Sequence, residues 1–171
     1  MNSLVVGGII KRVYNKFDMA SFSNRLRLQK IVYLLQEVAG INLGYVFSLY
    51  SYGPYSAELT KDAFQITDFD KVDKVGFEEP EVENKFKSFL GKLGNRKNDD
   101  NWLEIATSIH LIKKLYPSKT KVEIISIIEN KRRGLKGKSK KIEKVWDDIG
   151  GWLIWVANLN YYLTQKKASL I

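Results

Sequence analysis

Residues 48–59 read SLYSYGPYSAEL, and this stretch contains the end of a strand, a tight turn and the start of a helix. The residues 45–52 (YVFSLYSY) are rich in aromatic side chains, which favours an extended strand. Gly53 and Pro54 end that strand, because glycine permits unusual backbone angles and proline fixes one. Ser56 is placed to cap a helix over residues 56–67, with Glu58 in its first turn. The stretch therefore predicts a strand, a turn and a helix in close succession.

Three tyrosines, Tyr50, Tyr52 and Tyr55, surround this turn. A tyrosine combines a large apolar ring with a hydroxyl group, so it can fill a corner between a strand and a helix while its oxygen bonds a polar partner. If they are exposed beside a helix N-terminus, the same rings form a platform for a base or for a peptide of a partner. Both interpretations stay open from sequence, and the second makes the three tyrosines candidate partner-binding residues.

Apolar residues at helical spacing dominate the rest of the chain. A central helix is predicted over residues 24–40 (NRLRLQKIVYLLQEVAG), with Ser23 or Asn24 as its cap and Gly40 as its end. Residues 71–80 (KVDKVGFEEP) predict a short strand that pairs with residues 45–52. Further helices are predicted over residues 3–17, 81–93, 100–116, 118–133 and 140–165. The expected fold class is mainly α: a helical core with a small two-stranded β element and additional C-terminal helices.

Length and composition are typical of a globular protein. The chain has 171 residues and 44% hydrophobic content, so we expect a single α-rich domain with a core over residues 1–80 and a helical extension over 81–171. The absence of cysteine excludes disulfides and sulfur-ligated zinc, and it fits a cytoplasmic location. The apolar residues 149–163 are fewer than the roughly 20 that a membrane span needs. They predict a buried C-terminal helix, and no membrane partner is expected.

Charge is distributed unevenly along the chain, whose formal net charge is +9. Residues 113–144 contain twelve Lys or Arg residues and three Glu residues, whereas residues 68–83 contain seven acids and two lysines. Such cationic stripes neutralise phosphates in nucleic-acid binding, although a solvated face is the ordinary alternative for a charged run. A smaller basic group begins the central helix. The predicted nucleic-acid contacts are Arg25, Arg27, Lys30, Lys131, Arg132, Arg133, Lys136, Lys138, Lys140 and Lys141.

Two motifs resemble a known family. RLQKIVYLLQ (residues 27–36) and YSYGPYSAEL (residues 50–59) resemble motifs of the YwgA-like prokaryotic proteins, and WLEIATSIHLI (residues 102–112) is similar to the C-terminal helix of that group. The same motif pair is similar, more distantly, to the Panacea (SocA-like) antitoxin domain. The first resemblance implies a winged-helix-like core over residues 1–80. The second implies a protein that neutralises a partner toxin by protein contact.

No set of residues predicts a reaction. His110 is the one histidine of the chain, and neither a cysteine nor a local triad motif accompanies it. The stretch GLKGKSKK (residues 134–141) lacks the spacing of a phosphate-binding glycine loop. We therefore predict a protein that is not an enzyme, with no catalytic residue, no metal site and no cofactor.

Two functions are consistent with these observations. The first is a non-enzymatic DNA-binding regulatory protein, which contacts double-stranded DNA through its basic C-terminal patch. The second is an antitoxin-like protein-interaction module, which binds and neutralises a partner protein through its aromatic turn. The first predicts binding that weakens steeply with salt, because cations that neutralise phosphates release counterions.

Overall fold

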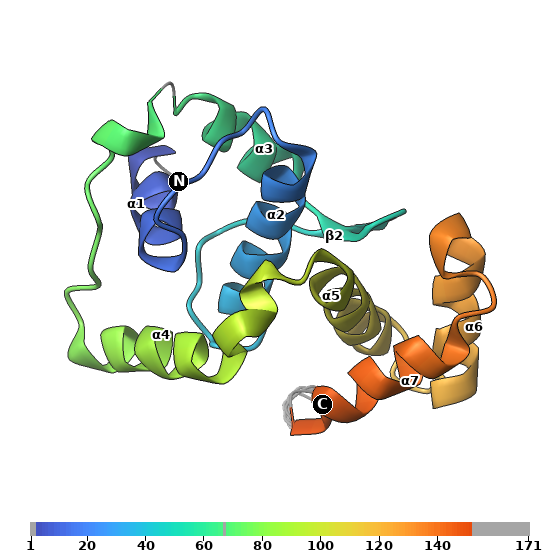
Figure 1. The fold of residues 1–171 in the computed structure, drawn as a ribbon. Coiled ribbons are helices and arrows are strands. Elements are labelled where there is room, and N and C mark those ends of the chain that lie inside the picture. The colour runs from blue at the N-terminus through green and yellow to red at the C-terminus, as the bar shows by residue number, and fades with distance from the viewer. Residues whose placement is uncertain (1–2, 67, 152–171) are drawn as a thin grey trace, which may run out of the picture. The chain divides into compact units, whose positions relative to one another are not determined.

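The computed structural model describes residues 3–66 and 68–151, which form a mainly helical fold with one two-stranded sheet (Figure 1). This confirms the predicted fold class. The chain divides into two compact units. The first unit consists of residues 1–48 and 54–103, and the second unit consists of residues 49–53 and 104–171.

The central helix of the first unit is α2 (Phe22–Glu37), which buries Leu28, Ile31 and Tyr33 among other side chains. Its cap is Ser21, whose hydroxyl accepts a hydrogen bond from the amide of Asn24 at 3.4 Å. The predicted caps, Ser23 and Asn24, are therefore wrong by two or three residues. The hydroxyl of Ser23 instead donates to Asp100. This partner lies 77 positions away, so a local sequence pattern could not predict it.

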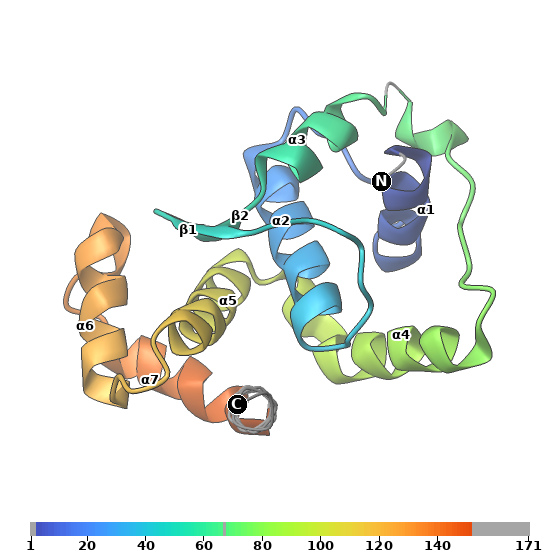
Figure 2. The ribbon, with the colours of Figure 1, turned by 180° about the vertical axis from the view of Figure 1, so that it is seen from behind.

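Two shorter helices of the first unit pack near the ends of α2. Figures 1 and 2 show α3 (Ala57–Phe64) beside the upper half of α2 and α4 (Pro80–Leu93) near its lower end. The predicted cap of α3 is confirmed, because Ser56 Oγ accepts a hydrogen bond from the amide of Leu59 at 3.3 Å. Two 3-10 turns, η1 (Phe69–Lys71) and η2 (Gly94–Asn98), complete the elements that follow α3 in this unit.

The helices α1 (Ser3–Val13) and α4 are joined by a charged and aromatic contact. Arg12 Nη1 donates to Glu83 Oε2 at 2.9 Å, and the Arg12 guanidinium lies 4.2 Å from the ring centroid of Phe86. Arg12 donates hydrogen bonds to both carboxylate oxygens of Glu83, and these bonds lower the pKa of Glu83 to about 2. Because α4 is tied to α1, residues 81–103 belong with the first unit, so the expected division between core and extension at residue 80 differs from the one observed at residue 103.

The sheet is a hairpin of β1 (Ser48–Tyr50) and β2 (Gly53–Tyr55). Only two residues join the strands, so the strands are antiparallel. The predicted pairing of residues 45–52 with residues 71–80 is wrong, since residues 72–79 form no strand and the partner of β1 is the next segment of the chain. Gly53, with φ of +85°, adopts the left-handed backbone that turns the chain back on itself.

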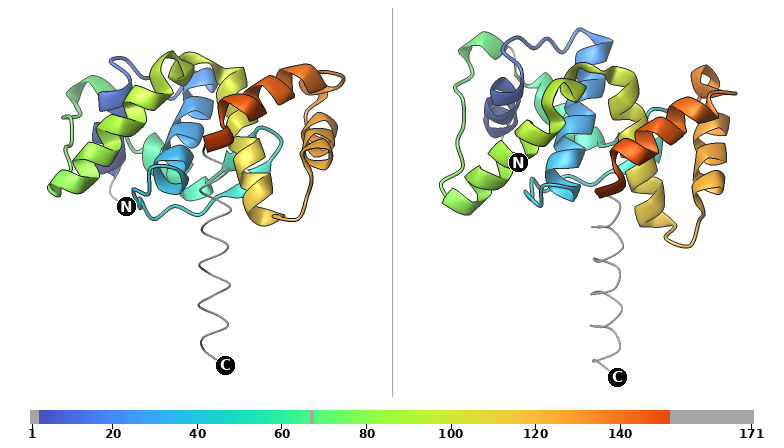
Figure 3. Two further views of the ribbon diagram at one scale, coloured as in Figure 1. Left: turned by 90° about the horizontal axis from the view of Figure 1, so that it is seen from below. Right: turned by 60° about the horizontal axis from the view of Figure 1, so that its bottom comes forward.

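The second unit contains most of α5 (Asp100–Leu115), followed by α6 (Lys121–Lys131), the 3-10 turn η3 (Arg133–Leu135) and α7 (Ser139–Asp148). Its described core is aliphatic, with Ile128 and Ile142 buried on α6 and α7. Figure 3 shows that α6 and α7 meet at η3 and do not run parallel to each other.

The other helix predictions agree with the structure to different degrees. The predictions over residues 81–93 and 100–116 match α4 and α5 to within one residue at each end. The prediction over residues 118–133 is too long at both ends, because Thr120 caps α6 and Arg132 follows its last residue. The helix predicted over residues 140–165 begins as α7, and from residue 152 it lies outside the described residues. No helix within residues 3–66 and 68–151 has the length and apolar character that crossing a membrane requires.

Candidate nucleic-acid interface

The segment before α3 is held from within the first unit by two neighbouring polar side chains of α2. The Gln29 amide pairs with both backbone groups of Ser56: Nε2 donates to the carbonyl at 2.9 Å, and Oε1 accepts from the amide at 2.8 Å. Lys30 Nζ donates to the carbonyl of Pro54 at 2.6 Å, and Lys30 is only 2% exposed. The expectation that Lys30 contacts nucleic acid is therefore corrected, because its charged group points inward to the backbone.

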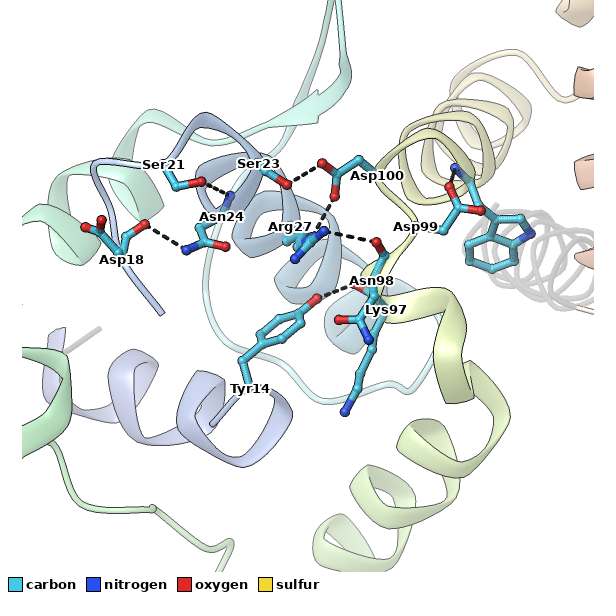
Figure 4. A network of polar contacts seen from close by, with 11 residues as sticks. Tyr14, Asp18, Ser21, Ser23, Asn24, Arg27, Lys97, Asn98, Asp99 and Asp100 are labelled. Atoms are coloured by element: carbon cyan, nitrogen blue, oxygen red, sulfur yellow. Dashed lines mark hydrogen bonds and ion pairs between the residues drawn. The ribbon is translucent and has the colours of Figure 1, made fainter. Parts of the chain in front are cut away.

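The other two cations of the central helix also bond within the first unit, and Figure 4 shows the contacts of Arg27. Arg27 forms an ion pair with Asp100, with a distance of 2.6 Å from Nε to Oδ1, and its Nη2 donates to the carbonyl of Asn98 at 3.0 Å. Arg25 Nη1 donates to the carbonyls of Met19 and Ala20 at 2.7 Å each. The predicted basic group of Arg25, Arg27 and Lys30 thus serves to fix local structure, and the candidate interface reduces to the C-terminal cations.

These C-terminal cations lie on residues 131–144, which we call the basic segment. It runs from the last residue of α6 through η3 into α7, and it contains eight cations and one carboxylate, that of Glu143. The buried side chains of Leu135 and Ile142 anchor it to the second unit. Seven of its cations are exposed, namely Lys131, Arg133, Lys136, Lys138, Lys140, Lys141 and Lys144.

The exposed cations of the basic segment differ from other cations of the same unit in their pairing. Lys119 and Lys121 each contact a carboxylate, Glu123 at 3.2 Å and Asp147 at 2.9 Å. In contrast, none of the seven exposed cations of the basic segment forms an ion pair or a side-chain hydrogen bond within the described part of the chain. The segment therefore presents uncompensated positive charge to solvent.

The start of α7 adds to this charge. A helix N-terminus carries a partial positive charge and favours acidic residues, yet the first turn of α7 contains Lys140 and Lys141 and no acid. Its N-cap, Lys138, makes no side-chain cap, and the one hydroxyl nearby, Ser139 Oγ, donates to Glu129 at 2.8 Å. Cations placed against the helix dipole are unfavourable for an isolated helix and favourable for binding an anion.

The remaining predicted cation, Arg132, is held in place. Its Nε donates to Glu104 Oε1 at 2.9 Å, and its guanidinium lies 4.2 Å from the ring centroid of Tyr52. The side chain of Glu104 is only 6% exposed, so this carboxylate is an internal anchor. Glu104 is not among the site residues predicted from sequence; a buried carboxylate of this kind requires a cationic partner, which Arg132 supplies.

The three tyrosines of the turn occupy different environments. Tyr50 is 59% exposed and Tyr52 is 37% exposed at the tip of the hairpin, whereas Tyr55 is half-buried. Gly53 and Pro54, which lie between Tyr52 and Tyr55, and Ser56, which follows Tyr55, are buried. The turn therefore has features of both interpretations given above. Its buried residues form a structural corner before α3, and the rings of Tyr50 and Tyr52 are exposed at the tip of the hairpin.

Three observations on the described residues concern catalysis and ligand binding: the environment of His110, the potential metal ligands, and a cavity in the first unit. His110 is 1% exposed, and burial, followed by the nearby charge of Lys114, lowers its pKa to about 4. No cluster of three or more potential metal ligands occurs among the described residues. A cavity of about 110 Å³ in the first unit is lined by apolar side chains such as Leu28 and Phe69, with Asp18 as its single charged lining residue.

Comparisons with protein-family models, with curated proteins and with solved structures found no match to this chain. The candidate site is therefore defined by its geometry and charge alone.

Proposed function

We propose that the protein is a non-enzymatic DNA-binding regulatory protein that contacts the phosphate backbone through the basic segment. The observation that carries this proposal is the pairing pattern: seven exposed cations without a carboxylate partner among the described residues, in a protein whose other cations are often paired. Uncompensated charge of this kind raises the potential around a surface and attracts polyanions. Binding would take place in the cytoplasm, and the resemblance to the YwgA-like group implies a prokaryotic cell.

The test removes charge without touching the core. A variant with Lys136, Lys138, Lys140 and Lys141 all changed to Gln is compared with a control in which four other exposed lysines are changed to Gln, namely Lys16, Lys61, Lys74 and Lys92. Both variants lose the same formal charge. Binding to duplex DNA is followed by fluorescence anisotropy between about 50 and 200 mM salt.

We expect the first variant to lose affinity and to show a smaller dependence on salt, by about one unit of slope for each phosphate contact removed. The control should retain most of the affinity at the higher salt concentration, because its lysines lie outside the basic segment. Equal losses in the two variants would mean that only net charge matters. Absence of binding by the wild-type protein at about 50 mM salt would refute the proposal.

A second candidate is the antitoxin-like module that binds and neutralises a partner protein through the hairpin tip. The exposure of Tyr50 and Tyr52 favours it, because aromatic residues are enriched in protein interfaces. It predicts that a protein co-purifies stably with the wild-type chain and is lost from the Tyr50→Ala variant. Purification of the chain alone from its own cells, without any stoichiometric partner, would count against it.

A further inference from the structure

A notch lies in the second unit where the hairpin tip, α5 and the end of α6 meet. Its volume of about 10 Å³ holds about one water molecule, so it is a surface depression and not a pocket for a whole ligand. Tyr50 lines it from the hairpin, and Lys131 and Arg132 line it from the end of α6. An aromatic ring, the first two cations of the basic segment and the carboxylate of Glu104, which pairs with Arg132, therefore border one small depression.

Arg132 is preorganised at this notch. The bond from Nε to Glu104 and the Tyr52 ring beneath the guanidinium fix the plane of the side chain, which is 30% exposed. Its Nη1 and Nη2 donate to no group within the described part of the chain. An arginine held in this way keeps donors available for a phosphate and loses little side-chain entropy on binding, because its plane is already set.

Tyr50 supplies a second planar surface beside these donors. With 59% of its area exposed, the side chain offers surface to an incoming planar group. Bases of nucleic acids stack on tyrosine rings and on guanidinium planes when they are not covered by neighbouring bases. In a continuous duplex both faces of each base are covered, and only the phosphates can reach such a notch.

We propose that this notch binds an unpaired nucleotide, whose base stacks on Tyr50 while Lys131 and the Nη groups of Arg132 bind an adjacent phosphate. This inference rests on the proposed function and adds that the protein prefers strands with unpaired bases to continuous duplex. Positive charge on the adjoining basic segment favours nucleic acid over a peptide as the occupant, because a phosphodiester carries a charge at every residue. Glu104 also lines the notch, and it acts as a positioning residue, because its buried carboxylate pairs with Arg132 and holds that side chain in place.

The experiment compares a fluorescent oligothymidylate with a duplex of the same length, using the full chain. Tyr50→Ala removes the ring, Tyr50→Phe retains it, and Tyr116→Ala removes another half-exposed tyrosine of the second unit that does not line the notch. Tyr50→Ala should weaken single-strand binding by about 5-fold to 100-fold and leave duplex affinity unchanged. Tyr50→Phe and Tyr116→Ala should behave like the wild type.

A direct probe of stacking separates this inference from the proposed function. An oligonucleotide with one 2-aminopurine should lose fluorescence on binding to the wild type and less so with Tyr50→Ala, because stacking quenches the fluorophore. The proposal that the notch binds an unpaired nucleotide is refuted if the wild-type protein binds duplex and single strand equally well, or if Tyr50→Ala weakens binding to both alike. Either result would leave the proposed DNA binding intact. If neither nucleic acid binds, both proposals fail, and loss of a co-purifying protein from Tyr50→Ala would then assign the tip to a protein partner.

Discussion

The hydrogen bonds of Gln29 lead to a quantitative prediction for the first unit. Gln29→Leu keeps an apolar body of similar size but removes the acceptor for the amide of Ser56, a residue that is only 2% exposed. The carbonyl of Ser56 keeps a donor, because the amide of Thr60 lies 3.2 Å away. One buried N–H group therefore loses its partner, and such a group costs about 1–3 kcal/mol. The free energy of unfolding should fall by that amount.

The same helix supplies a matched control. Gln36, two turns further along α2, pairs with both backbone groups of Tyr45 in the same manner, at 2.8 and 2.9 Å. These bonds are only partly buried, so water can replace the side chain, and Gln36→Leu should cost less than about 1 kcal/mol.

Urea denaturation followed by circular dichroism gives the two free energies of unfolding, with the m-values as a check that the transition is unchanged. The smaller loss is expected for the Gln36 variant. If both variants lose equal stability, or if Gln29→Leu loses none, burial does not set the strength of this contact and the reasoning is refuted.

Three further outcomes can be measured by the same method. Burial lowers the pKa of His110 to about 4 from its ordinary value of 6.5, so between these values the unfolded chain binds a proton that the folded protein excludes. The free energy of unfolding should therefore fall by up to about 3 kcal/mol as the pH drops from 6.5 to 4, and His110→Gln should remove that part of the pH dependence. Gly53→Ala should destabilise the hairpin by more than about 1 kcal/mol, because φ is +85° there and the new Cβ would lie 2.5 Å from Ser108 Oγ; no loss of stability would contradict this. Thr120→Ala should cost about 1 kcal/mol through loss of the capping box with Glu123, and Thr120→Ser should retain it.

The helices could be predicted from sequence because their signals are local. Apolar spacing within α4 and α5 and the cap at Ser56 depend on residues a few positions apart. The pairing of β1 could not be predicted in the same way, since residues 53–55 were assigned to a turn, although their backbone extends after Gly53 and pairs with β1. The winged-helix-like core implied by the family resemblance stays a prediction.

The candidate site was harder to predict, because exposure decides whether a cation can bind a ligand. Lys30 and Lys136 are the same residue type and were both predicted to contact nucleic acid, yet the first is buried against a carbonyl and the second is exposed. Arg132 pairs with Glu104, which lies 28 positions away, so the periodicity of the sequence could not predict this contact. The charge pattern identified the basic segment, whose role in binding stays a prediction. The contacts of Lys30, Arg25 and Arg27 within the first unit set these three residues aside from the predicted contacts.

The two motifs that resemble a known family, residues 27–36 and 50–59, and the basic segment occupy different parts of the chain. The polar residues of RLQKIVYLLQ, above all Gln29, Lys30 and Gln36, make hydrogen bonds to the backbone between residues 45 and 56. These hydrogen bonds hold this part of the fold in place, so the motif is explained by the architecture without reference to a binding partner. The exposed cations lie outside these motifs. A folded Gln29→Leu variant that still binds nucleic acid as well as the wild type would separate the two roles, since its defect should be confined to stability.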